Sequence, residues 1–313
     1  MRRLALLVSV VFVVAACGAA GGPPSPAPST APVGGYPGWP PNVASDLIPY
    51  PVSTEIVVGP NRLLVNLIDQ QNNALASQSL PVELRFYDLA ADPATPKQDE
   101  QAIYLPTIQG RPGLYRTNVT FDAAGDWGIE AIASEADGSK RTGRVVFQVL
   151  QTGYTPAIGA QAPSTPTPTA TTAAQIATIS SDTSPDPDFY KISESDALAQ
   201  HKPFVLVFAT PAFCRSATCG PTLNLVKSVA ADYKDRLTFI HVEPYELQVV
   251  NGQLQPVLSE DNLPIPVAAT NTWGLQTEPY IFVVNSSGKV TAKFEGIASD
   301  EELRAAFDAD LSS

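Results

Sequence analysis

Between residues 46 and 150, apolar and polar side chains alternate in short runs. A period of two places successive side chains on opposite faces of a strand, so each run predicts a strand with one buried face. The runs cover 62–69, 81–88, 113–121, 127–132 and 143–149, with turn-forming residues between them. Several short strands at this spacing predict an all-β sandwich.

The pattern changes after residue 187, where buried apolar runs alternate with helical periodicity. Strands are predicted at 204–208, 237–243, 280–284 and 290–294, the last two joined as a hairpin. Helices are predicted from Ser193 or Ser195 to Gln200, from Pro221 to about Lys234, and after the capping box Ser299–Glu302. This order predicts an α/β domain, interrupted at 244–272 by a long irregular segment that is a lid, a partner surface or packing filler.

Two stretches rich in proline and small residues lie outside these blocks. Residues 17–45 are expected to form a stalk, and residues 151–187 a Pro/Thr/Ala-rich linker, because such sequences bury little apolar surface. The blocks that remain, 46–150 and 188–313, have the usual size of single domains. We therefore expect two folded domains.

The first sixteen residues have the pattern of a signal peptide. Arg2 and Arg3 precede an apolar run at 4–14, and small residues lead to Cys17. This end resembles a bacterial lipobox, in which the cysteine becomes the lipid-modified first residue. The resemblance implies a lipid anchor at Cys17 on the extracytoplasmic face of the cell membrane. A cleaved signal peptide without lipid is the alternative.

Acidic residues outnumber basic ones, which limits the choice of partners. The formal net charge is -12, with 19 Lys and Arg against 31 Asp and Glu. Removal of the signal peptide takes away Arg2 and Arg3 and leaves 17 basic residues against 31 acidic ones, a charge of -14. Such a chain is not expected to bind nucleic acid or anionic lipid surfaces through charge.

Cys214 and Cys219 are the two cysteines that remain beside Cys17. They lie in the loop between the strand at 204–208 and the helix at Pro221, where the free N–H groups of a helix start favour thiolate over thiol. Disulfides persist outside the cytoplasm, so we expect a bonded pair. On one continuous helix their Cα atoms would be roughly 8 Å apart, beyond disulfide reach, so at least one must lie outside the helix.

Three local motifs in the second block resemble the thioredoxin fold family. They are the helix end and strand start at 231–238, the Trp-Gly-Leu-Gln-Thr-Glu-Pro segment at 273–279, and the hairpin turn at 285–290. The resemblance implies a thiol–disulfide oxidoreductase without a cofactor, in which Cys214 and Cys219 react beside a cis-proline at Pro279. It implies protein thiols and disulfides outside the cytoplasm as substrates and a membrane redox partner.

The sequence also departs from that family. The family carries Trp-Cys-Gly-Pro-Cys, whereas this chain has Phe213-Cys214 and then Cys219-Gly220-Pro221-Thr222, so Cys219 matches either the second or the first family cysteine. Val207 or Phe208 stands where the family often has a buried acid for proton transfer. Chain order favours Cys214 as the attacking thiol, and helix-end electrostatics favours Cys219. Arg215 would stabilise a thiolate and Glu278 would oppose it.

The first block resembles extracytoplasmic immunoglobulin-like sandwich domains of the YtkA and FixH type. The resemblance rests on a Gly-x-Tyr strand at 113–115 followed by a Gly-x-Trp strand at 125–127. Some of those relatives handle copper, but residues 46–150 contain no Met, His or Cys ligand. We therefore expect no metal here, take Trp127 as a core residue, and assign the domain to binding or spacing.

Other readings of the second block remain open. The cysteine pair is a structural staple if the domain is a non-catalytic binding module. Thr210-Pro211 ahead of a Cys-x-x-x-x-Cys spacing resembles the peroxiredoxin Q group, although the family's Pro-x-x-x-Thr-x-x-Cys loop is not matched. A copper site of the Sco type would need a Cys-x-x-x-Cys and a loop histidine. His201 is instead expected in a surface turn and His241 within a strand.

Overall fold

The structure is a computed structural model that describes residue 36, residue 39 and residues 46–108 and 110–312. The expected signal peptide at 1–16, the lipid-accepting Cys17 and all of the expected stalk at 17–45 except Tyr36 and Trp39 lie outside the described residues. Residues 34–313 form one compact unit. Within the residues that the structure describes, no helix combines the length and the apolar character that crossing a membrane requires.

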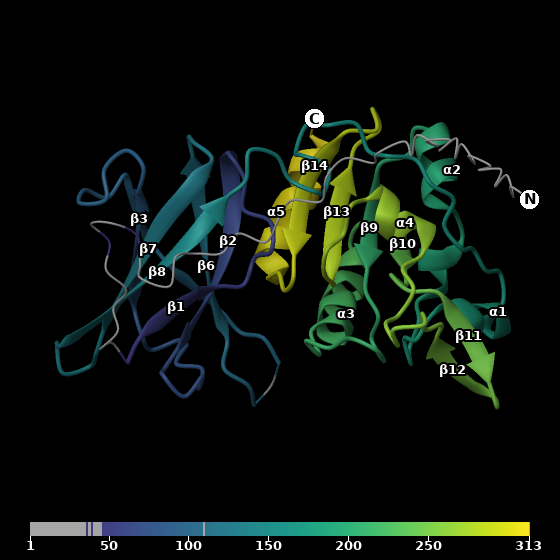
Figure 1. Cartoon of the computed structure of the whole chain (residues 1–313). Helices are drawn as coiled ribbons and strands as arrows, with labels where there is room; N and C mark the ends of the chain where they lie inside the picture. The colour runs from purple at the N-terminus through teal and green to yellow at the C-terminus, as the bar shows by residue number, and fades with distance from the viewer. Residues whose placement is uncertain (1–35, 37–38, 40–45, 109, 313) are drawn as a thin grey trace, which may run out of the picture. The chain divides into compact units, whose positions relative to one another are not determined.

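The N-terminal part of this unit is a sandwich of two four-stranded antiparallel sheets (Figure 1). One sheet has the order β1 (Ile48–Pro51), β2 (Gly59–Ile68), β6 (Leu114–Phe121), β5 (Ile103–Leu105). The other has the order β4 (Gln98–Gln101), β3 (Val82–Asp88), β7 (Gly125–Ser134), β8 (Lys140–Val149). The five predicted strands are confirmed as β2, β3, β6, β7 and β8. The strands that were not predicted are three or four residues long and lie at sheet edges.

Alternation along the strands builds the sandwich core. In β6, Tyr115, Thr117, Val119 and Phe121 are buried, whereas the residues between them are exposed or half-buried. Trp127 on β7 is 1% exposed, and its indole N–H donates to the Ala123 carbonyl over 3.0 Å. Its expected role as a core residue is confirmed.

The C-terminal part is a mixed α/β region around one four-stranded sheet of order β10 (Thr238–Val242), β9 (Phe204–Phe208), β13 (Tyr280–Val284), β14 (Val290–Glu295). β9 and β10 are parallel, whereas β13 is antiparallel to both of its neighbours. Every residue of β9 and β13 is buried. The four predicted strands and the antiparallel hairpin are confirmed.

Helices cover both faces of this sheet, which explains why its two central strands are apolar throughout (Figure 1). Val205 and Val207 share one core with α3 (Cys219–Ala230) and α5 (Asp300–Leu311). Phe204, Leu206 and Phe208 share the other core with α2 (Glu194–Ala199) and α4 (Ala268–Thr272). The predicted capping box of α5 is present, with Ser299 and Glu302 each accepting from the other's backbone N–H.

Two sequence predictions in this region were wrong. Helix α3 begins at Cys219, two residues before Pro221, so the proline is the third helical residue and not the first. The N–H of that residue also has no partner within a helix, which is why the helix tolerates it. The segment 244–272 is not irregular: it forms the hairpin of β11 (Leu247–Val250) and β12 (Gln253–Pro256), then α4. Asn251 and Gly252 make its turn with φ of 53° and 77°, the Asn-Gly signature of a tight hairpin.

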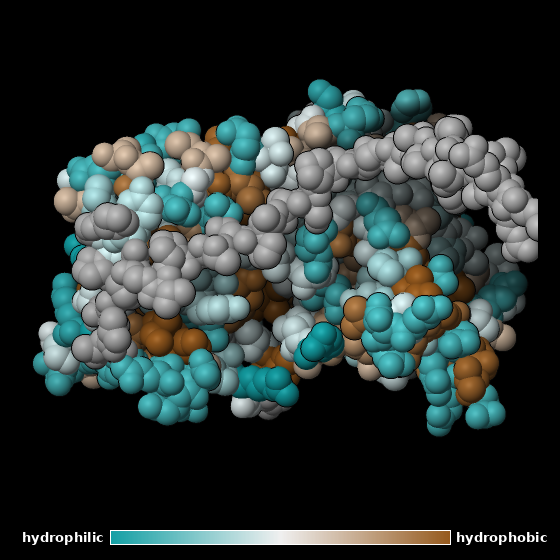
Figure 2. Space-filling model, viewed as in Figure 1, coloured by the Kyte–Doolittle hydropathy of each residue, from teal (hydrophilic) through white to brown (hydrophobic). Residues whose placement is uncertain are grey.

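That hairpin leaves apolar side chains in contact with solvent. Val249 is 55% exposed and Leu263, further along the same segment, is 59% exposed. Figure 2 shows hydrophobic side chains beside hydrophilic ones over β11 and β12.

The segment expected to act as a linker, 151–187, has ordered structure of its own. It contains α1 (Ala173–Ile179), capped by a box between Thr172 and Gln175, and leads into the 3₁₀ turn η1 (Pro187–Tyr190). Ile176 is buried in the same core as α3 and α5. The segment also contacts the cysteine loop, since the Ser181 hydroxyl accepts from the Ala212 N–H over 3.1 Å. The domain boundaries themselves stay a prediction.

Polar and apolar contacts join the sandwich to the α/β region within the compact unit. Arg62 and Arg116, both from the sandwich, lie 2.7 and 3.1 Å from the Glu302 carboxylate of α5. Leu64, Leu105 and Ile297 form a small buried apolar cluster beside them.

Candidate functional site

The two cysteines lie where the sheet, a loop and a helix start meet. Strand β9 ends at Phe208, and residues 209–218 form a loop that returns to the first turn of α3. Cys214 is half-buried in this loop, and Cys219 is the fully buried first residue of the helix. The requirement that at least one cysteine lie outside the helix is therefore met.

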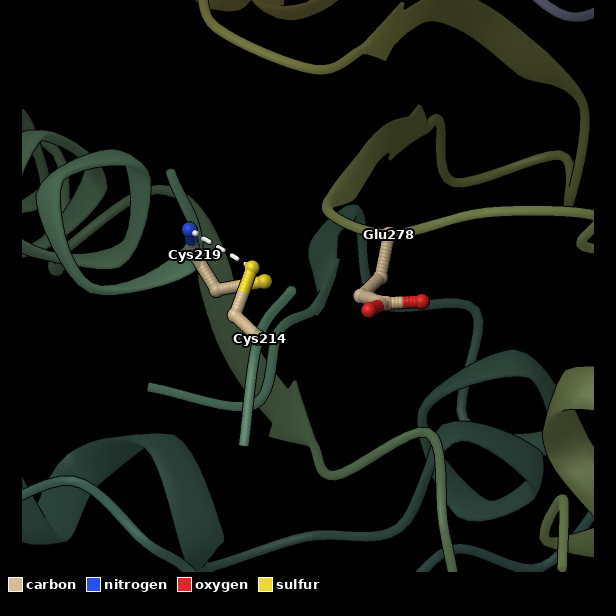
Figure 3. Close-up of side chains that lie close together, drawn as sticks. All are labelled: Cys214, Cys219 and Glu278. Carbon is tan, nitrogen blue, oxygen red and sulfur yellow. Dashed lines mark hydrogen bonds between the residues drawn. The ribbon is translucent and has the colours of Figure 1, made fainter. Parts of the chain in front are cut away.

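Most of the hydrogen bonds at the cysteine pair are made to the sulfur of Cys214, whereas Cys219 has a backbone hydrogen bond with Thr210. The backbone N–H of Cys219, at the start of α3, donates to Cys214 Sγ over 3.4 Å (Figure 3). The Ser216 hydroxyl lies 3.2 Å from the same sulfur. Both cysteines are free thiols in the structure, so the expected disulfide bond is not formed there. A sulfur atom that receives a helix-start N–H and a hydroxyl is favoured as the anion.

These contacts separate the pKa values of the two thiols. A hydrogen bond from the Cys219 sulfhydryl is the largest cause that lowers the pKa of Cys214 to about 5, aided by the Ser216 hydroxyl and by backbone N–H groups. The pKa of Cys219 is raised, first because its proton is shared with Cys214 and second because the side chain is buried. Cys214 is thus the accessible thiolate and Cys219 the buried, protonated thiol.

Glu278 completes the site from a distant part of the chain. The Glu278–Pro279 peptide bond is cis, as the resemblance implies, and Tyr280 then begins β13. A carboxylate oxygen of Glu278 and the two sulfur atoms all lie within 4.8 Å of one another (Figure 3). The Tyr245 hydroxyl donates to Glu278 Oε2 over 2.8 Å. Burial is the largest cause that raises the pKa of Glu278.

The other predicted residues contribute less. Arg215 is exposed, and its charge lowers the pKa of Glu278 without an ion pair between the two among the described contacts. Val207 and Phe208 are buried and apolar, so β9 carries no acid.

The sequence analysis did not identify Ser216 and Tyr245 as site residues. Ser216 lies between the two cysteines in the sequence, so its position could have identified it. No local signal links Tyr245 to a glutamate 33 positions later.

The two histidines are not part of this site. His201 is exposed in a turn with φ of 52°, as expected. His241 lies in β10, where its ring nitrogens contact the Tyr190 hydroxyl at 2.8 Å and the Ala209 carbonyl at 2.9 Å. Burial lowers the pKa of His241, so it is a hydrogen-bonded core residue in the neutral form.

Among the described residues, Cys214, Cys219 and Glu278 are the group whose ligand atoms are close enough to hold a metal ion. Two thiolates and one carboxylate are donors that zinc accepts, with a fourth position left for water. Binding would need both sulfurs as thiolates, so it would compete with thiol exchange for the same atoms.

Comparison with protein-family models and with curated proteins finds no match for this chain.

Proposed function

We propose that this protein is a membrane-anchored, extracytoplasmic thiol–disulfide oxidoreductase. The observation that carries the proposal is the asymmetry of the cysteine pair, with an accessible Cys214 thiolate in front of a buried Cys219 thiol. One reactive sulfur and one resolving sulfur within a single loop are what a thiol exchange cycle requires. A merely structural bridge has no need for such a difference between its two thiols.

The fold supports a thioredoxin-like assignment for the α/β region. A central strand leads through the cysteine loop into a helix, and the cis Glu278–Pro279 bond lies beside that loop. In this assignment Cys219 starts the helix but acts as the resolving thiol. The sandwich is assigned to the immunoglobulin-like class, with binding or spacing as its role.

The exchange proceeds in two displacements. The Cys214 thiolate attacks one sulfur of a substrate disulfide, a mixed disulfide forms, and the other substrate sulfur leaves as a thiolate. Cys219 then attacks Cys214 Sγ, which releases the second substrate sulfur and leaves a Cys214–Cys219 disulfide. The substrate gains two electrons and the protein loses two, and the reverse sequence oxidises a dithiol.

The location and partners in this proposal follow from the N-terminal sequence. A lipid on Cys17 would tether the folded part to the bilayer, and protein thiols or disulfides outside the cytoplasm would be the substrates. A membrane redox partner would reset the cysteine pair, and nucleic acid is not a partner.

The reduction potential of the full chain tests the proposal. Equilibration with glutathione and thiol trapping should give a value above about −270 mV, the range of exchangeable pairs. A value below about −300 mV would mark a structural bridge and favour the non-catalytic binding module. Peroxide consumption with a thiol reductant separates a peroxiredoxin-like activity from thiol exchange.

A pair of matched variants tests the assignment of the two sulfurs. Cys219→Ser should accumulate a mixed disulfide with glutathione at Cys214, because the resolving thiol is absent. Cys214→Ser should form almost none, because Cys219 is buried. Equal trapping by both variants would remove the assignment.

A further inference from the structure

The resolving thiol has a proton that must leave before it can act. Cys219 is 0% exposed, so bulk solvent reaches its proton poorly. Attack on a mixed disulfide nevertheless requires the Cys219 thiolate, since the thiol itself is a poor nucleophile. Strand β9 supplies no base, because Val207 and Phe208 are apolar. The proton therefore needs an acceptor from another element.

Glu278 is a carboxylate at the right distance for that task. Its oxygen is within 4.8 Å of the Cys219 sulfur, a gap that one water molecule can bridge. It approaches from the loop before β13, opposite the helix start that carries Cys219 (Figure 3). Tyr245, on the segment after β10, fixes Oε2 of Glu278 by a hydrogen bond. Two different elements thus hold the carboxylate in front of the cysteine pair.

The charges around Glu278 suit a group that gains and loses a proton. The titratable or charged groups that act on it are Tyr245, Cys214 and Arg215. Burial and the Cys214 thiolate disfavour its anion, whereas the Tyr245 hydroxyl and the Arg215 charge favour it. Formation of the mixed disulfide removes the negative charge on Cys214. Glu278 is therefore more readily an anion during the resolving step than during the attack on the substrate.

We propose that Glu278 is the proton acceptor for Cys219 in the resolving step, replacing the acid that β9 lacks. The Cys219 proton passes to the Glu278 carboxylate through one water, the thiolate attacks Cys214 Sγ, and the bond between Cys214 and the substrate breaks. The substrate sulfur leaves with the electron pair, and the proton on Glu278 neutralises it. In the oxidising direction Glu278 returns a proton to Cys219 as that sulfur leaves. The proposal rests on the proposed function.

The test is a single-turnover measurement on the full chain. Reduced protein is mixed with oxidised glutathione, and the mixed disulfide and released glutathione are followed by acid quench. Glu278→Gln keeps an oxygen to accept from Tyr245 but accepts no proton. We expect it to slow resolution about a hundredfold at pH 7, the scale of general acid–base catalysis. The deficit should shrink as pH rises, because hydroxide then removes the Cys219 proton.

Two controls make the outcome decisive. Glu246→Gln makes the same charge change at an exposed residue next to Tyr245 and should resolve at the wild-type rate. Glu278→Gln in a Cys219→Ser background should form the mixed disulfide within about twofold of the background rate, which also shows that the site is folded. If Glu278→Gln resolved the mixed disulfide at the wild-type rate and with the wild-type pH profile, the role of Glu278 would be overturned. Absence of any mixed disulfide in Cys219→Ser would instead overturn the proposed function.

Discussion

The sandwich and the α/β region each place a glutamate beside a tyrosine hydroxyl, with opposite consequences; Glu130 is buried and Glu278 is half-buried. In the sandwich, the Tyr87 hydroxyl donates to Glu130 Oε2 over 2.9 Å and Arg144 donates to Oε1 over 2.7 Å. In the α/β region, the Tyr245 hydroxyl donates to Glu278 over 2.8 Å, and the groups that face the carboxylate are thiols.

The two sites differ because an arginine, Arg144, contacts the glutamate in the sandwich. A guanidinium in contact with a buried carboxylate offsets the cost of burying the charge, so Glu130 acts as part of an ion pair that holds strands β7 and β8 together. Glu278 contacts a tyrosine but no cation among the described residues, and burial raises its pKa. The same side chain is thus structural in one region and suited to proton transfer in the other.

The largest expected effect is on stability and separates the two glutamates. Glu130→Gln should lower the free energy of unfolding by about 2 kcal/mol, because Arg144 loses its charged partner. Glu278→Gln should lower it by less than about 0.5 kcal/mol, because the amide still accepts from Tyr245 and no longer carries a half-buried charge. Urea unfolding at pH 7 measures both, and a larger loss for Glu278→Gln would reverse the comparison.

The next effect concerns the pH dependence of Cys214. With its pKa lowered to about 5, the thiolate persists as pH falls from 8 to 6, whereas an ordinary thiol is nearly all protonated there. After allowance for the lower nucleophilicity of such a thiolate, alkylation by iodoacetamide at pH 6 should be roughly tenfold faster than for an ordinary thiol. Cys219→Ala should move the inflection to higher pH, and an inflection that stays in place would show that the Cys219 sulfhydryl does not stabilise the thiolate.

The two tyrosines provide a matched pair with smaller effects. Tyr245→Phe should slow the resolving step by about fivefold, the equivalent of one hydrogen bond of about 1 kcal/mol, because Glu278 loses the group that positions it. Tyr87→Phe should lower stability by about 1 kcal/mol and leave resolution unchanged. Stopped-flow exchange and urea unfolding of both variants separate these roles. If Tyr87→Phe slowed exchange as much as Tyr245→Phe, the effect would be a general one on the fold.

The smallest effect is expected at Arg215. Its side chain is exposed, so its charge acts on the site through solvent and should change the rate of mixed-disulfide formation by at most about twofold. Arg215→Gln should show this difference at low salt and lose it at about 1 M salt, where charges are screened within about 3 Å. A large effect that persists in salt would give Arg215 a direct contact with the substrate.

The sequence by itself determined much of the fold, because hydrophobic periodicity reports which faces of a segment are buried. The five main sandwich strands, the four strands of the mixed sheet and the capping box at Ser299 all follow from local patterns. The cysteine pair and the proline at 279 were also visible. The short spacing of the two cysteines and the resemblance of the segment that ends at Pro279 to a known motif were enough to identify these residues.

Only the tertiary structure decided the chemistry of the site. Whether Cys214 or Cys219 becomes the thiolate depends on burial and on which sulfur receives the helix-start N–H, and neither is a property of the loop sequence. Glu278 and Tyr245 meet because the segments after β10 and before β13 end at the same edge of the sheet. Proton transfer depends on distances of a few ångströms between residues far apart in the chain, and only the packing of the sheet sets those distances.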